Sequence, residues 1–332
     1  MNPAGESTSP AGAAQGSSPL ARVGGSARGR TRCGRRAALD YRVSDAPLPW
    51  RLLLTRTIRR LSPAQVRAKL WRHRVLRRAL DAAGLHAWMD QATRPGKRVE
   101  LTRHAVPAPL PVPVTVALVA DLHLNGVDRE ANEMLEILER ERPDAIVIAG
   151  DLTSEDGSDA VYAGMLSRLR APRGVWMVPG NWDYWLPVTD LGALCAGAGV
   201  RLLSNEAAEI APGLWLAGVD DAVSGEPDPA RALSSVPEGA WVMALLHCPI
   251  TFDDVAGRCA LALAGHTHGG QVRIPGLPPL WLPDGCGRYV AGWYERNGSR
   301  LYVSRGIGAK TLPIRLWCRP ELALFTVGPG AP

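Results

Sequence analysis

Short runs of branched apolar residues alternate with amphipathic segments from about residue 112 onward. The runs at residues 112–120 (VPVTVALVA) and 145–149 (AIVIA) have the length and the β-branched composition of buried strands. Between them, residues 129–142 repeat their apolar positions with helical spacing. Strands that alternate with helices in this way predict parallel strands joined by helical crossovers.

The pattern continues with a second helix at residues 159–170 and a third strand at residues 175–178. Later strand-like runs follow one another more closely, with fewer helical segments between them. We expect these strands at residues 201–203, 214–219, 241–246, 260–264, 300–304 and 322–327. Closely spaced strands after an alternating segment favour either a mixed sheet or two stacked sheets, so the sequence predicts an α/β fold.

The first part of the chain has a different pattern. Residues 1–46 are rich in Gly, Ser, Ala and Arg and hold few large apolar groups, which predicts a disordered basic tail. Residues 47–103 combine apolar positions at helical spacing with many arginines, and residues 62–65 (SPAQ) are typical of a capped helix start. We therefore expect a basic amphipathic helical arm there, followed by a proline-rich linker at residues 104–111.

Charge divides the chain at about the same place. Residues 1–110 hold 21 Lys and Arg against 6 Asp and Glu, whereas residues 111–332 hold 17 against 26. A basic amphipathic arm is typical of an anionic membrane surface as partner, here through residues 50–83, but the same pattern suits a helix that packs on its own domain. Nucleic acid is a less favoured partner, because the arm has no aromatic–basic stacking platform and no groove-reading motif.

Cysteines and apolar segments bear on location. The six cysteines are scattered without C-x-x-C pairs, which favours free thiols in a reducing compartment. No apolar run reaches the roughly 18 residues that a membrane span needs. Arg35 and Arg36 resemble a twin-arginine start, but the residues after them are not apolar, so no export signal is expected. The expected location is cytoplasmic, and peripheral on the inner face of the cell membrane if the arm binds lipid.

Polar residues that suit metal binding follow the predicted strands directly. Four of the seven histidines lie at strand ends, together with two aspartates and an asparagine. The carboxyl ends of strands are where α/β sheets place ligands, and alternate spacing points two side chains the same way. The set is Asp121, His123, Asp151, Asn181, His247, His266 and His268. Imidazole, carboxylate and amide donors together suit Mn, Fe, Zn or Co better than Ca or Cu(I).

In this order, the motifs D-x-H, G-D, G-N, H and G-H-x-H resemble those of the calcineurin-like metallophosphoesterases over residues 112–328. Residues 265–271 (GHTHGGQ) and 301–308 (LYVSRGIG) are similar to a bacterial phosphodiesterase branch of that superfamily. Some members of the branch are membrane-associated, and a related group cleaves the diphosphate of UDP-diacylglucosamine. The resemblance implies a four-layer α/β/β/α sandwich with mixed sheets and a dinuclear metal site at the strand ends.

The resemblance also implies roles for the polar set. Two divalent metal ions (Mn, Fe, Zn or Co) are implied, with Asp151 and Asn181 as catalytic residues. The implied ligands of the first metal are Asp121, His123 and His268; those of the second are Asn181, His247 and His266; and Asp151 bridges both.

One residue departs from the family pattern. The superfamily usually has a histidine after Gly-Asn, which is thought to protonate the leaving oxygen. This chain has Trp182 there, and an indole cannot do acid–base work near neutral pH. Three interpretations are open. Asp183, the third catalytic candidate, or Tyr184 supplies the proton; the leaving group is good enough to need no acid, as a phosphate is; or the protein is slow or inactive.

Three functions follow as hypotheses. The favoured one is a dinuclear metal-dependent hydrolase of a phosphodiester or diphosphate bond, acting on a lipid or nucleotide-sugar substrate at the membrane face. The second is a soluble nucleotide phosphodiesterase in which the arm has no part in substrate choice. The third is a catalytically weak metal-binding scaffold, with Trp182 as the marker of lost catalysis.

Overall fold

A computed structural model describes residues 61–126, 128–186, 188, 190–310 and 312–330, apart from the side chains of residues 94 and 95. The tail predicted for residues 1–46 and the first part of the predicted arm, up to residue 60, lie outside the described residues. Among the described helices, none is long and apolar enough to cross a membrane.

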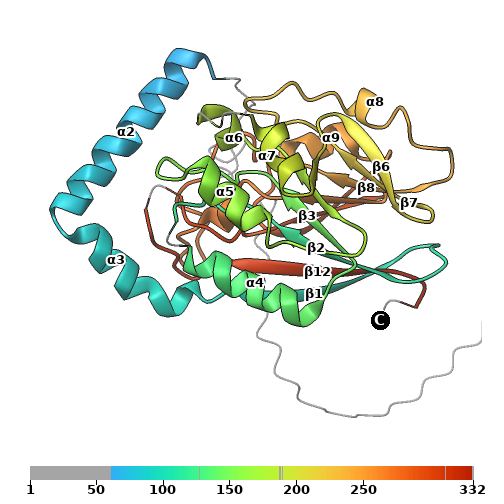
Figure 1. Ribbon diagram of the computed structural model, residues 1–332, viewed down its shortest axis with the longest axis horizontal. Coiled ribbons are helices and arrows are strands. Elements are labelled where there is room, and N and C mark those ends of the chain that lie inside the picture. Colours follow the sequence, from blue (N-terminus) through green and yellow to red (C-terminus); the bar gives the residue numbers. More distant parts are fainter. Residues whose placement is uncertain (1–60, 127, 187, 189, 311, 331–332) are drawn as a thin grey trace, which may run out of the picture. The chain divides into compact units, whose positions relative to one another are not determined.

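The first sheet has six strands in the described part of the chain (Figure 1). In spatial order they are β1 (Glu100–Pro107), β12 (Glu321–Gly328), β2 (Val114–Val119), β3 (Ala145–Ala149), β4 (Val175–Val178) and β5 (Val200–Leu202). β2 to β5 run parallel, as the early strand–helix alternation predicts. β12 lies antiparallel beside β2, and β1 pairs parallel with β12 at the edge, so the sheet is mixed.

The second sheet also has six described strands. Their spatial order is β10 (Gly292–Arg296), β11 (Ser299–Val303), β9 (Leu261–Ala264), β8 (Trp241–Leu245), β7 (Leu214–Gly218) and β6 (Glu206–Ala211). The four central strands run parallel, and an antiparallel partner closes each edge. The later, closely spaced strands of the sequence therefore form a separate mixed sheet.

Helices cover the outer faces of both sheets. The first sheet packs against α4 (Arg129–Glu141), α5 (Asp159–Leu166) and α7 (Leu191–Gly197), and the second against the short α8 (Pro229–Ala232) and α9 (Phe252–Val255). A separate apolar layer lies between the sheets, where Leu118 and Phe325 of one sheet pack with Leu216 and Leu263 of the other. The four-layer α/β/β/α sandwich is thus confirmed. The remaining short helices are α6 (Asn181–Trp185), η3 (Pro249–Thr251) and η4 (His268–Gly270).

The described part of the arm consists of α2 (Pro63–Ala82) and α3 (Leu85–Thr93), followed by the 3-10 turn η2 (Arg94–Lys97). The capping box at its start is present. The Gln65 N–H donates to Ser62 Oγ at 3.3 Å, and the Ser62 N–H donates to Gln65 Oε1 at 2.9 Å.

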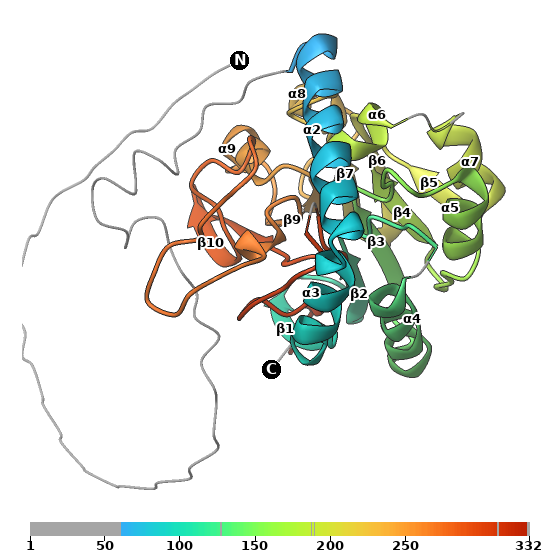
Figure 2. The same cartoon turned by 90° about the vertical axis from the view of Figure 1, so that its left-hand side faces the viewer.

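One face of α2 packs on the body. Leu70, the buried residue of this helix, lies in an apolar cluster with Trp182 and Leu186. About two turns further along α2, Arg77 forms an ion pair with Asp156 of the body. Figure 2 shows α2 running across this end of the body. This face therefore packs on its own domain, while the opposite face exposes Trp71 and Val75.

The linker prediction is wrong for residues 104–107, which form the second half of β1. The prolines that suggested a linker begin only at Pro107, the last residue of an edge strand. Proline is tolerated there, because an edge strand has one side without a neighbouring strand, where a missing N–H costs no hydrogen bond of the sheet. The body therefore starts at Glu100, and the predicted arm ends earlier than residue 103.

The hairpin of β10 and β11 was also not predicted from the sequence. Asn297 and Gly298 connect these strands with φ values of 50° and 76°. Positive φ at both positions is what the common two-residue hairpin turn requires, and Asn-Gly is its strongest sequence signal. The sequence therefore contains a signal for this strand pair.

A buried glutamate at the start of β12 binds β1, β11 and the turn that follows β11. Glu321, at the start of β12, accepts hydrogen bonds from Thr102 Oγ1 of β1 at 2.8 Å and from Tyr302 Oη of β11 at 2.5 Å. It also pairs with the Arg305 guanidinium at 3.2 Å and accepts from the Arg305 N–H at 3.1 Å. The turn after β11 is thereby held against both sheets.

We expect Glu321→Gln to destabilise the fold by about 3 kcal/mol, because it leaves the Arg305 charge buried with a weakened partner. Glu100→Gln is the matched control. Glu100 pairs with the same guanidinium at 3.2 Å, but its side chain is 43% exposed against 2% for Glu321. Its loss should cost less than about 1 kcal/mol. Urea unfolding of both variants measures the difference, and equal losses would contradict a structural role for Glu321.

Candidate metal centre

All seven polar residues predicted from the strand ends come together at one junction of the two sheets. The loops after β2, β3 and β4 bring the first four, and the loops after β8 and β9 bring the histidines of the second sheet. Each side chain is buried, with His123 the most exposed at 6%. We call Asp121, His123, Asp151, Asn181, His247, His266 and His268 the seven-residue cluster.

The backbone at the cluster is strained. Five of its residues have positive φ, between 45° and 72°, a region that side-chain-bearing residues rarely adopt. Strain of this kind costs roughly 1–3 kcal/mol per residue and persists where the surroundings impose it, most often at functional sites. The five are Asp121, His123, Asp151, His266 and His268.

One group within the cluster is formed by Asp121, His123 and His268. The His123 and His268 rings stack, with their Nε2 atoms 3.1 Å apart. His268 Nε2 lies 3.8 Å from Asp121 Oδ1. Potential ligand atoms of these three residues all lie within 4.8 Å of one another, which is compact enough for a single ion.

The second group surrounds His247. Its Nε2 lies 3.2 Å from Asn181 Oδ1 and 3.0 Å from His266 Nδ1. Asp151 stands between the groups: its Oδ1 lies 3.4 Å from His247 Nε2 and its Oδ2 lies 3.5 Å from His123 Nε2. One carboxylate thus faces imidazoles of both groups.

Main-chain carbonyls fix the orientation of three rings. The outer nitrogens of His123 and His247 lie 3.1 Å from Thr153 O and 2.7 Å from Ala149 O. His266 Nε2 contacts Asp284 O in the same way. A ring nitrogen next to a carbonyl carries the proton, so the other nitrogen directs a lone pair into the cluster. This is the usual arrangement of metal-binding histidines.

The donors fit divalent cations. Within the described residues, Asp151 Oδ2 has no hydrogen-bond partner although the atom is buried. Buried polar atoms are normally paired, and lone pairs that converge at about 3 Å repel each other unless a proton or a cation lies between them. Imidazole, carboxylate and amide oxygen are the donor types that suit Mn, Fe, Zn or Co.

Without a cation the cluster is balanced by protons. Burial raises the pKa of Asp121 to about 7. Burial opposes charge on the His247 ring, but the Asp151 carboxylate outweighs it and raises the pKa of His247 to about 10. Burial lowers the pKa of His123 to about 4, so that ring is neutral at pH 7. Metal binding at His247 therefore has to displace a proton.

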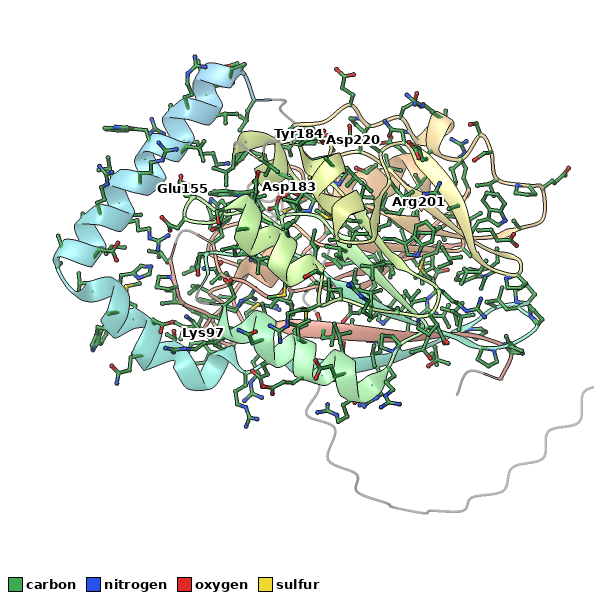
Figure 3. The ribbon with its side chains drawn as sticks, viewed as in Figure 1. Lys97, Glu155, Asp183, Tyr184, Arg201 and Asp220 are labelled. Carbon is green, nitrogen blue, oxygen red and sulfur yellow. The ribbon has the colours of Figure 1, made fainter. Side chains whose placement is uncertain are left out.

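Asp183 and Tyr184, the two residues considered as proton donors in place of the histidine that Trp182 replaces, do not face the cluster. Asp183 Oδ2 accepts from the N–H groups of Asp151 and Gly180, at 3.0 and 2.9 Å, and its Oδ1 accepts from Thr153 N–H at 3.1 Å. The Tyr184 hydroxyl donates to Asp220 Oδ1 at 2.5 Å (Figure 3). Asp183 thus holds the Asp151 loop in place.

Lys310 was not predicted from the sequence as a residue of this site. This side chain is only 5% exposed, and its Nζ lies 4.8 Å from the centre of the Trp182 ring. The Trp182 ring in turn packs edge-on against His123, with ring centres 5.5 Å apart. A signal was available, because Lys310 is the single lysine of residues 111–332.

A cavity of about 360 Å³ adjoins the cluster on the side of the arm. His123 lines its inner wall, and α3 contributes His86 and Asp90. Arg129 and Arg315 add two guanidinium groups to the lining. The cavity is therefore polar and carries positive charge next to the candidate metal centre.

Comparison with known proteins places the chain in a family. Residues 114–270 match the family model described as calcineurin-like phosphoesterase. An uncharacterised metallophosphoesterase of Aquifex aeolicus is 32% identical, over 63% of this chain and 82% of the relative. YkuE of Bacillus subtilis, also an uncharacterised metallophosphoesterase, is 27% identical over 69% and 85%. The phosphodiesterase YaeI of Escherichia coli is 28% identical over 64% and 82%.

The chain belongs to the calcineurin-like metallophosphoesterases and is a metal-dependent phosphoesterase. The family is typically dinuclear, and the grouped ligand atoms of this chain agree with that.

We expect Gly180→Ala to abolish metal-dependent turnover. A Cβ at this position would collide with the Asp151 main chain and carboxylate and would lie 2.9 Å from His247 Cε1. Gly164→Ala in α5 is the control, because a Cβ there meets no atom within 4 Å. It should leave turnover unchanged and stabilise the fold by roughly 0.5 kcal/mol. Metal-dependent turnover and thermal unfolding of both variants test this, and an active Gly180→Ala would show that the Asp151 loop tolerates displacement.

Proposed function

We propose that this chain hydrolyses a phosphodiester or diphosphate bond with two divalent metal ions held by the seven-residue cluster. The observation that carries the proposal is the position of Asp151. Its two oxygens face imidazoles of both groups at 3.4 and 3.5 Å, and Oδ2 has no hydrogen-bond partner among the described residues. A carboxylate placed in this way suits a ligand shared by two cations.

The two groups divide the remaining ligands. We assign Asp121, His123 and His268 to one metal and Asn181, His247 and His266 to the other. The identity of the metals, Mn, Fe, Zn or Co, follows only from the donor types. When bound, two such cations neutralise phosphoryl oxygens and activate a water for in-line attack.

The chain's own residues prepare the site for this reaction. Asp183 ties the Asp151 and Gly180 loops together through three N–H groups, so we assign it a positioning role. The Trp182 N–H donates to Asp151 Oδ1 at 2.8 Å, which orients the shared carboxylate. The Trp182 ring and Leu70 of α2 exclude water from one side of the cluster.

The adjoining cavity bears on the substrate. A volume of about 360 Å³ lies at the lower end of the range for small-molecule pockets, and its lining is polar. These properties favour a nucleotide or nucleotide-sugar group next to the scissile phosphate over an acyl chain inside the cavity. A lipid-linked substrate would have to leave its acyl chains outside, at a membrane surface.

The central test is Asp151→Asn, which keeps the shape of the side chain but removes its charge. We expect bound metal to fall from two ions per chain and hydrolysis of bis-p-nitrophenyl phosphate with Mn²⁺ to fall by about 100-fold or more. Asp190→Asn is the control. Asp190 caps α7 through its side chain, and asparagine caps a helix equally well.

Elemental analysis and turnover of wild type, with and without chelator, complete the test. Two bound metals without turnover of either bis-p-nitrophenyl phosphate or a UDP-linked diphosphate would reject hydrolysis and favour the metal-binding scaffold.

We also propose that the outer face of the arm docks on an anionic membrane surface at the cytoplasmic side. Trp71 is 63% exposed and Trp88 is 65% exposed, and the exposed Arg67 and Arg78 lie on the same side of α2 as Trp71. Apolar rings flanked by arginines complement a surface of anionic headgroups. The competing hypothesis is a soluble nucleotide phosphodiesterase that has no need of the membrane.

Vesicle sedimentation of the full chain distinguishes the two. We expect binding to vesicles that contain phosphatidylglycerol and not to pure phosphatidylcholine, and we expect Arg67→Glu with Arg78→Glu to abolish it. Arg140→Glu with Arg168→Glu, two exposed arginines outside the arm, should bind like wild type. Absence of binding, or equal loss in both double variants, would support the soluble enzyme.

A further inference from the structure

Lys310 is a buried cation without a fixed acidic partner. Within the described residues, no carboxylate lies within the 4.0 Å of an ion pair from its Nζ. The ammonium instead lies among three tryptophan rings, 4.8 Å from the centre of Trp182, 5.6 Å from that of Trp185 and 6.0 Å from that of Trp281. Aromatic faces stabilise a cation but do not neutralise it. The site therefore keeps a positive charge available for a ligand.

The main chain fixes where this lysine stands. The Lys310 N–H donates to Gln271 Oε1 at 2.9 Å, and Gln271 Nε2 donates to Lys310 O at 3.0 Å. Gln271 follows the η4 turn that begins at His268. Lys310 is thus tied to the same loop that carries a cluster histidine.

Lys310 opens onto the cluster. A small cavity of about 60 Å³ is lined by Lys310, Trp182 and His123, and α2 closes it with His73 and Arg77. The charges of Asp151 and Asp121 also act on the Lys310 ammonium. Lys310 therefore lines a cavity that reaches the cluster at His123.

The geometry of in-line displacement decides whether a residue that lines this cavity can reach the leaving group. In an in-line reaction, an attacking water held among the cluster side chains leaves the opposite side of phosphorus to the leaving group, and the cavity beside His123 can receive that group. Trp182 lines this cavity, but its indole does not release a proton near neutral pH. Lys310 is a proton-bearing group on the same wall.

We propose that Lys310 is the proton donor to the leaving oxygen of the phosphoester, an inference that rests on the function proposed above. As the bond between phosphorus and the leaving oxygen breaks, its electron pair stays on that oxygen. The oxygen takes a proton from Lys310 Nζ, and the neutral amine then regains a proton from water.

The environment suits that role. Burial, opposed by Asp151 and helped by the charge of Lys69, lowers the pKa of Lys310 to about 8. An amine with a pKa close to the working pH releases a proton more readily than an ordinary lysine but still carries one for most of the time. Burial likewise lowers the pKa of the neighbouring His73 to about 4, so that ring is neutral at pH 7 and leaves Lys310 as the better donor.

The test compares leaving groups of different basicity. Wild type, Lys310→Met and Lys310→Arg are assayed with Mn²⁺ on the p-nitrophenyl, p-chlorophenyl and phenyl esters of methyl phosphate. For Lys310→Met we expect kcat/KM on the phenyl ester to fall by about 100-fold or more, with a much smaller loss on the p-nitrophenyl ester, whose leaving group needs little help. Lys310→Arg should behave like Lys310→Met, because a guanidinium keeps its proton.

Two further readouts separate this proposal from other causes. Arg201→Met removes another cation that lies over a tryptophan, with its guanidinium 5.3 Å from the ring of Trp176, at a place remote from the labelled Asp183 (Figure 3). It should keep the wild-type rates. Bound metal and the unfolding temperature should be unchanged in the Lys310 variants, which excludes a collapsed site.

Three results would overturn the proposal. They are an equal loss on all esters, no loss on any, and full recovery of the phenyl ester by Lys310→Arg, which would indicate a charge without proton transfer. A wild-type protein that hydrolyses none of these esters, and neither bis-p-nitrophenyl phosphate nor a UDP-linked diphosphate, would instead reject the proposed function itself.

Discussion

Burial of four imidazoles, two aspartates and an amide at one junction of two sheets is the constraint on which the rest of the structure depends. Charged groups removed from water cost several kcal/mol each unless partners balance them. In this chain protons balance the charge of the cluster only in part. The pKa of Asp121 is about 7 and that of His247 is about 10, so both groups can carry a proton near neutral pH. Divalent cations balance it better, because each neutralises several donors at once. The cluster therefore exchanges protons for metal, and the surrounding fold has to hold the donors in place in both states.

The frame that holds them is made of main chain rather than of side-chain packing alone. Carbonyl groups of Thr153 and Ala149 orient the rings of His123 and His247, and the carboxylate of Asp183 binds three N–H groups beneath Asp151. These contacts hold the left-handed backbone of the cluster in place, because the strained residues lie in the short loops that follow the strands. The hydrogen-bonded strands thus hold both ends of the loops in which the strained residues lie.

The sequence predicted the parts of this structure that depend on local pattern. β3 and β4 have the bounds expected from their apolar runs, and the seven polar residues at strand ends do meet. It failed where a weak local signal was decided by partners far along the chain. The second half of β1 was taken for a linker because prolines begin at its last residue, while its pairing with β12 depends on residues more than 200 positions away. Lys310 escaped for a similar reason, since a lysine in a loop is normally solvated and its burial here depends on side chains from distant parts of the chain, three tryptophans among them.

Trp182 is better understood together with its neighbours than as the loss of a catalytic group. Its ring supports Lys310 on one side, packs against His123 on another, and receives Leu70 and His73 of the arm. A smaller or polar ring would leave the ammonium without its aromatic support and the helix without its anchor. Residues of the arm, the tryptophan and the lysine therefore line one cavity beside the cluster, and the outer face of α2 is separated from that cavity by the helix alone.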